Sequence, residues 1–95
     1  VITDTWTSMG EEAEKEERKK IFKDYQINRQ LLAAANAGAM VMHCLPAYRG
    51  QEITEEVFEE HADEISNEAE NRLHAQKALL TWLAGKARGD ESLLA

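Results

Sequence analysis

The 95-residue sequence has one cysteine, one proline and five glycines, and these scarcities exclude several classes of protein. A single cysteine cannot form an internal disulfide, and it fits a protein from a reducing compartment. Three scattered histidines beside that cysteine do not have the spacing of a zinc site. No apolar run approaches the roughly 18 residues of a membrane span, and nothing at the amino end resembles a signal peptide. We therefore expect a soluble protein with no metal and no membrane partner.

The net charge of the chain also limits which partners it can bind. Eleven basic and 18 acidic residues give a net charge of -7, which argues against a nucleic acid partner. Such a chain cannot steer an anion over long range, so an anionic substrate requires local arginine or backbone N–H groups. Apolar residues make up 43% and charged residues 31%, as in a globular protein, and this length allows one small domain with a modest core.

Two apolar segments are predicted as strands, and each ends at a chemically useful side chain. Residues 1–3 read as the end of one strand, followed by Asp4. Residues 39–42 are apolar without alternation, as in a strand covered on both faces, and the predicted strand extends to residue 45 with Cys44 near its end. Ligands bind at the carboxyl ends of strands in open α/β sheets, so Asp4 and Cys44 suggest a single site.

Helical spacing and capping residues predict four helices between and after the strands. Ser8 with Glu11 has the form of a capping box. Residues 63–66 are too short to assign and fit a brief strand or turn. The predicted helices are 11–25, 29–35 after the cap Asn28, a short helix from the cap Thr54 to residue 60, and a long helix from the Asn67–Glu70 pair to about residue 87. This order predicts half of an α/β domain, because two strands alone leave sheet edges uncovered.

The segment from Asp4 to Gly10 has two interpretations. A carboxylate on Asp4 and a hydroxyl on Ser8 could both face an ammonium group, with backbone N–H groups of the following helix start holding a carboxylate. Together they would suit the zwitterionic end of an amino acid. Alternatively, Asp4 merely ends a strand and Ser8 merely caps a helix, which is a common arrangement.

The run His43-Cys44-Leu45-Pro46 is similarly open to two interpretations. The thiol of Cys44 can hydrogen-bond or accept a proton near a reacting amine, but a free cysteine is often a small core residue. The Leu45–Pro46 bond is of the type that can be cis, at roughly 5–6% in folded proteins. A cis bond would make the Leu45 carbonyl a fixed acceptor. We expect His43 to be a hydrogen-bonded core histidine.

Arg72, near the start of the long helix, also has two interpretations. Its guanidinium could clamp a carbonyl or phosphate oxygen, or it could pair with Glu68 on the helix surface.

In this order and spacing, residues 4–10 (DTWTSMG), 43–46 (HCLP) and 70–72 (ENR) resemble the ornithine carbamoyltransferase family. The resemblance covers nearly the whole chain and about the last third of such an enzyme. It implies an α/β fold: a partial three-layer, parallel-sheet (Rossmann-like) domain with a long carboxyl-terminal helix, as a fragment of a two-domain enzyme. Residues 1–88 would be the carboxyl-terminal part of the ornithine-binding domain. The final helix would pack on the absent carbamoyl phosphate domain, and residues 89–95 would be a flexible tail.

The resemblance also implies a reaction and a role for each motif residue. The carbamoyl group of carbamoyl phosphate would pass to the side-chain amine of L-ornithine, giving L-citrulline and phosphate in arginine biosynthesis or catabolism. No metal or organic cofactor is implied. The resemblance implies that Asp4 and Ser8 bind the α-ammonium group of ornithine and that the Met9 N–H binds its α-carboxylate. It implies that Cys44 accepts a proton beside carbamoyl phosphate and that Leu45 contacts carbamoyl phosphate through its backbone. Arg72 would bind the carbamoyl oxygen.

Parts of the family pattern are missing from the chain. The Ser-x-Arg-Thr phosphate loop and the His-Pro-x-Gln segment are absent, so this chain alone is not expected to turn over. The resemblance implies a homotrimer or higher homo-oligomer, and the cytoplasm is the default location.

Two alternatives remain open at this point. The first is a carbamoyltransferase for another amine. Aspartate enzymes usually carry proline where Cys44 stands, and putrescine and N-acetylornithine enzymes depart from the pattern at 8–10. The second is a non-catalytic, acidic helical interaction module, which should fold cooperatively by itself.

Overall fold

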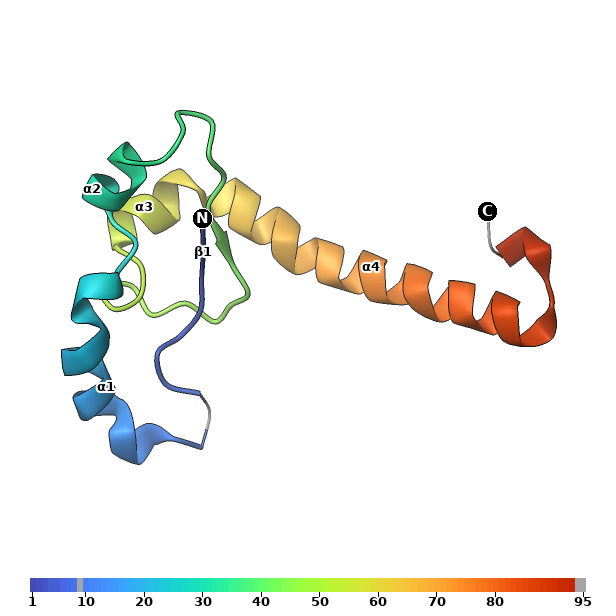
Figure 1. The fold of residues 1–95 in the computed structure, drawn as a ribbon, viewed down its shortest axis with the longest axis horizontal. Coiled ribbons are helices and arrows are strands. Elements are labelled where there is room, and N and C mark those ends of the chain that lie inside the picture. Colours follow the sequence, from blue (N-terminus) through green and yellow to red (C-terminus); the bar gives the residue numbers. More distant parts are fainter. Residues whose placement is uncertain (9, 94–95) are drawn as a thin grey trace.

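Two short parallel strands form the sheet of the molecule (Figure 1). The computed structural model describes residues 1–8 and 10–93. Strand β1 (Ile2–Thr3) pairs with β2 (Met42–His43), with Ile2 opposite Met42. The Met42 N–H donates to the Val1 carbonyl at 2.8 Å. Both predicted strands are present, but the second is shorter than 39–45 because only Met42 and His43 have a strand beside them.

The first predicted helix forms as three joined helical parts. They are the 3₁₀ turn η1 (Glu12–Glu14), helix α1 (Lys15–Phe22) and the 3₁₀ turn η2 (Lys23–Tyr25). The predicted Ser8–Glu11 capping box is wrong. The Glu11 N–H donates to the backbone carbonyl of Ser8 at 3.1 Å, and it is Glu12 that accepts from the Gly10 N–H at 3.0 Å.

Helices α2 (Arg29–Ala33) and α3 (Glu55–Glu60) begin at the predicted caps. The Asn28 side chain accepts from the Leu31 N–H at 2.8 Å, and the Thr54 hydroxyl accepts from the Val57 N–H at 3.3 Å. Each cap satisfies a backbone donor that the first helical turn leaves free. α2 ends at Ala33, slightly earlier than predicted.

The core is small and consists of aliphatic side chains from several elements. Ile27, between η2 and α2, lies beside residues 52–54: its N–H donates to the Glu52 carbonyl at 2.9 Å and its carbonyl accepts from the Thr54 N–H at 3.0 Å. This pairing holds the chain before α3 against the rest of the molecule. The buried apolar core consists of Ile27, Val41, Ile53, Val57 and Ile65.

Helix α4 (Ala62–Arg88) is longer than predicted. The predicted start at Asn67 and the brief strand or turn at 63–66 are both wrong, since these residues belong to the first turns of the helix. Ile65, 1% exposed, packs in the core from this segment and holds it helical. The helix ends at Gly89, whose φ of 66° is the left-handed conformation of a glycine cap.

The free edge of β2 is covered by two carboxylates of α4. Glu64 accepts from the Val41 N–H and Glu68 from the His43 N–H, each at 2.8 Å. Because these glutamates are four residues apart, they lie on one face of the helix and match alternate residues along the strand. The carboxylates thus take hydrogen bonds that a neighbouring strand would otherwise accept, and they fix α4 beside β2.

Beyond Glu68, α4 projects away from the other elements as a long arm (Figure 1). The radius of gyration is 17.8 Å, against about 12 Å for a compact chain of this length. Leu73 and Leu80 on the arm are 66% and 67% exposed. After the arm, the 3₁₀ turn η3 (Glu91–Leu93) packs against the end of α4. None of the helices in the described residues combines the length and apolarity that crossing a membrane requires.

Candidate active site at the strand ends

The two strand ends meet at a hydrogen bond between Cys44 and Asp4. The Cys44 thiol donates from Sγ to Oδ1 of Asp4 at 3.1 Å, although the residues are 40 positions apart in the sequence. The parallel pairing of β1 and β2 produces this contact, because it brings both carboxyl ends to the same edge. The predicted meeting of these two side chains is confirmed.

This hydrogen bond determines which of the two side chains is protonated and which is charged. The hydrogen bond from Cys44, reinforced by one from the Thr5 N–H, holds the pKa of the Asp4 carboxyl below its usual range. The same bond, with burial and the negative charge of Asp4, raises the pKa of the Cys44 thiol above its ordinary value of 9.0. At neutral pH Asp4 is therefore a carboxylate and Cys44 carries the proton.

The chain turns sharply directly after Cys44. The Leu45–Pro46 peptide bond is cis, the isomer that the sequence left open, and Leu45 has a φ of 58°. A leucine in this left-handed region needs support from its surroundings. That support includes a hydrogen bond from the Leu45 N–H to Nδ1 of His43 at 2.8 Å.

His43 is fully buried and hydrogen-bonded, which confirms the prediction of a core histidine. Its Nε2 lies 2.8 Å from Oε1 of Glu52, which is also fully buried. The same Glu52 oxygen accepts from the Tyr48 N–H at 2.7 Å. The other oxygen, Oε2, is buried without a hydrogen-bond partner among the described residues.

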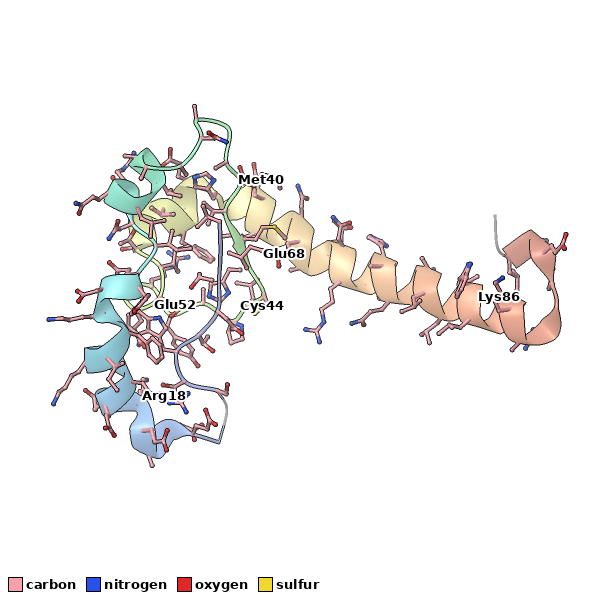
Figure 2. All side chains as sticks on the ribbon, viewed as in Figure 1. Arg18, Met40, Cys44, Glu52, Glu68 and Lys86 are labelled. Atoms are coloured by element: carbon pink, nitrogen blue, oxygen red, sulfur yellow. The ribbon has the colours of Figure 1, made fainter. Side chains whose placement is uncertain are left out.

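Glu68 connects α4 to the same site. Its bond to the His43 N–H lies one residue before Cys44, and Figure 2 shows Glu68 on the first part of α4 near β2. Arg72 follows one helical turn later on the same face. The prediction that Arg72 pairs with Glu68 is not supported, because no ion pair or hydrogen bond joins Arg72 to another residue in the described part of the chain.

Sequence reasoning missed Glu52 and gave Glu68 the wrong partner. The available signal for Glu52 was its place next to Ile53 in a segment that turns back toward the core, where a carboxylate requires a partner. His43 is that partner.

Among the described residues, Ser8 makes no hydrogen bond to Asp4 or Cys44. Ser8 is exposed and lines a separate hollow of about 50 Å³ together with Lys15, Tyr48 and Gln51. Met9 lies outside the described residues, so its predicted backbone contact has no counterpart here.

The groups at the strand ends can bind an organic cation. Within residues 1–8 and 10–93, no three His, Cys, Asp or Glu side chains gather as ligands of a metal ion. Asp4 supplies a negative charge for a cation, and the turn at Leu45 supplies backbone groups. A polar molecule with an amine is the kind of ligand this arrangement can hold.

Comparison with known proteins identifies the family of the chain. Residues 1–83 match the Asp/Orn binding domain of aspartate/ornithine carbamoyltransferase. The chain belongs to this family. Its relatives include the ornithine carbamoyltransferases of Bifidobacterium longum subsp. infantis, 65% identical over the whole chain and 30% of that protein, and of Nitratiruptor sp., 59% identical over 95% of the chain and 29% of that protein.

Solved structures agree with this assignment. Anabolic ornithine carbamoyltransferase from Campylobacter jejuni superposes with a TM-score of 0.86 at 55% identity, covering 90% of the chain and 28% of that structure. The Pyrococcus furiosus enzyme gives a TM-score of 0.70 at 51% identity, covering 84% of the chain and 26% of that structure. The expected α/β fold with a parallel sheet and a long final helix is confirmed. The chain spans about 30% of the length of the curated relatives it matches.

Proposed function

We propose that the full-length protein containing this chain is an ornithine carbamoyltransferase. In this reaction the side-chain amine of L-ornithine attacks the carbonyl carbon of carbamoyl phosphate. A carbon–nitrogen bond forms, the bond to the phosphate oxygen breaks, and the amine loses a proton. The products are L-citrulline and phosphate.

The hydrogen bond between Cys44 and Asp4 is the observation that carries this proposal. A carboxylate and a thiol at one sheet edge give a reacting amine both an anionic partner and a route for its proton. Relatives named ornithine carbamoyltransferase, at 59–65% identity, support ornithine as the substrate.

The protonation of the pair refines the role of Cys44. A thiol that already holds its proton accepts another only by passing its own to a neighbour, and Asp4 lies at 3.1 Å as that neighbour. In our proposal Cys44 takes the amine proton while handing its own proton to Asp4. The pair then acts as one proton acceptor, with Asp4 also attracting the ammonium group of ornithine.

The remaining roles complete the site. The turn at Leu45 presents backbone groups to carbamoyl phosphate, and Arg72 binds the carbamoyl oxygen, where negative charge grows in the transition state. Ser8 joins Asp4 at the α-ammonium group, and the Met9 N–H holds the α-carboxylate.

We further propose an assembly and a place in metabolism. The full-length protein forms a homotrimer or larger homo-oligomer in the cytoplasm and serves arginine metabolism. Residues 1–88 form the last part of its ornithine-binding domain. Of the tail predicted over residues 89–95, residues 91–93 form the turn η3 against α4, and residues 94–95 lie outside the described residues. The exposed leucines of the α4 arm support packing of this helix on the carbamoyl phosphate domain.

Citrulline formation by the full-length protein tests the proposal. The assay supplies carbamoyl phosphate with ornithine, putrescine, N-acetylornithine or aspartate as acceptor. Of these four acceptors, we expect only ornithine to support turnover. Turnover with a different amine would retain carbamoyl transfer and overturn the ornithine assignment, and no turnover with any acceptor would overturn the enzyme itself.

A further inference from the structure

The fully buried pair of His43 and Glu52 lies directly behind the Cys44–Leu45 turn, outside the set of residues given a role above. Both side chains have no solvent exposure, and they lie nine positions apart in the sequence. Figure 2 labels Glu52 and Cys44 in the part of the molecule that holds the core. A buried carboxylate is costly, so its hydrogen bonds indicate what it does there.

The bonds around the imidazole fix which nitrogen carries the proton. A backbone N–H can only donate, so the 2.8 Å contact from Leu45 requires Nδ1 of His43 to be an acceptor. Nε2 must then carry the hydrogen, and it donates to Oε1 of Glu52 at 2.8 Å. His43 is therefore the neutral tautomer with its proton on Nε2.

Glu52 is itself held rigidly. Its backbone carbonyl accepts from the Ile27 N–H at 2.9 Å, and its Oε1 also accepts from the Tyr48 N–H at 2.7 Å. Thus the backbone of Glu52 is fixed by the core, and its carboxylate contacts both ends of the 43–48 turn. Its second oxygen makes no hydrogen bond among the described residues, so Oε1 carries the whole interaction.

We propose that Glu52 is a positioning residue: through His43 it holds Leu45 in its left-handed conformation and thereby aims the Cys44 thiol and the Leu45 backbone at the substrates. The chain of contacts runs from Glu52 to His43 to the Leu45 N–H. The expected effect of Glu52 on turnover rests on the proposed function, whereas its expected effect on the reactivity of the Cys44 thiol does not.

Kinetics of the full-length protein test this with two substitutions of Glu52. Glu52→Gln keeps an oxygen at Oε1 and is the matched control; Glu52→Leu removes the acceptor. We expect Glu52→Leu to lower kcat by about 100-fold, since misplacement of reacting groups by about 1 Å has an effect of this size. The KM values should stay within about threefold of the parent, and Glu52→Gln should retain most of the activity. Equal kcat values for the two variants would overturn the proposal.

A second comparison remains decisive if Glu52→Leu does not fold. In the Glu52→Gln background, which has no buried charge, His43→Asn places an oxygen where Nδ1 was, while His43→Gln places its amide where Nε2 was. We expect kcat of the His43→Asn variant to be at least about 10-fold higher than kcat of the His43→Gln variant, because only asparagine retains an acceptor for the Leu45 N–H. A glutamine variant that is equally active or better would contradict it.

The reactivity of the Cys44 thiol can be measured without catalysis, so it tests this inference independently of the proposed function. The rate of Cys44 alkylation by iodoacetamide, located by peptide mass spectrometry, reports the freedom of the thiol. We expect alkylation several-fold faster in Glu52→Leu than in Glu52→Gln, because the thiol leaves its bond to Asp4. Equal rates would overturn the positioning role, even if the parent protein makes no citrulline.

Discussion

The two halves of helix α4 differ although they belong to one continuous helix. The first half, through Glu68, buries Ile65 in the core and gives two carboxylates to the edge of β2. The second half, from Leu73 onward, carries leucines that are 48–67% exposed. The difference in exposure lies in what each half contacts. The anchored half shapes the site, and the arm offers a surface to the rest of the protein.

The largest expected effect comes from the site that the anchored half supports. Asp4→Ala in the full-length protein removes both the anionic partner of the amine and the proton acceptor of Cys44. We expect citrulline formation to fall by about 100-fold or more. Asp24→Ala, at an exposed aspartate of η2, is the control and should leave the rate unchanged. Equal rates for the two variants would remove Asp4 from the site.

Next comes the contrast between a buried and an exposed apolar residue of α4. In the chain described here, Ile65→Ala should lower the free energy of unfolding by about 2–5 kcal/mol, because it leaves a cavity in the core. Leu73→Ala should change it by less than about 0.5 kcal/mol, since the side chain is 66% exposed. Urea denaturation measures both values.

The same substitutions in the full-length protein sharpen the comparison. If the arm packs on another domain, Leu73→Ala becomes a core substitution there and costs about 2–5 kcal/mol as well. A cost that stays below about 0.5 kcal/mol in both settings would show that the arm has no partner in the protein.

A smaller effect is expected from the carboxylates that anchor the helix. Glu68→Ala leaves the His43 N–H without its acceptor and should cost about 1–3 kcal/mol of unfolding free energy. Glu70→Ala, two residues along, removes only an exposed contact to His74 and should cost less than about 0.5 kcal/mol. Equal costs would mean that the helix is not anchored through Glu68.

The smallest effect is a shift in the titration of Cys44. Its pKa lies above 9.0 because the thiol donates to Asp4, so the protonated form favours the folded state. This contribution is complete below pH 9.0 and is lost as the pH rises through the folded-state pKa. Asp4→Asn removes the charge, and the midpoint of the pH profile of Cys44 alkylation should move down. An unchanged midpoint would contradict the geometry of the pair.

Features encoded by neighbouring residues could be predicted from the sequence. The caps at Asn28 and Thr54 depend on a side chain and a backbone N–H three residues away, and both are confirmed. The meeting of Asp4 and Cys44 could also be predicted, because parallel strands place their carboxyl ends at one edge.

Features that depend on distant contacts could not be predicted. The start of α4 was placed at Asn67 because a local cap pattern was present, whereas the helix actually begins where Ile65 enters the core and Glu64 reaches Val41. Glu52 was missed because its partner lies nine residues earlier, across a turn. The Ser8 side chain was expected to cap a helix, but the Glu11 N–H donates to the Ser8 backbone carbonyl, and Glu12 accepts from the Gly10 N–H.

Protection of Cys44 by substrates tests most directly the claim that the strand-end site is where carbamoyl transfer takes place. The full-length protein is treated with iodoacetamide alone, with carbamoyl phosphate and ornithine, or with carbamoyl phosphate and putrescine, and Cys44 modification is followed by mass spectrometry. We predict that carbamoyl phosphate with ornithine slows modification strongly, and that carbamoyl phosphate with putrescine slows it much less. Modification at the same rate under all three conditions would contradict the account.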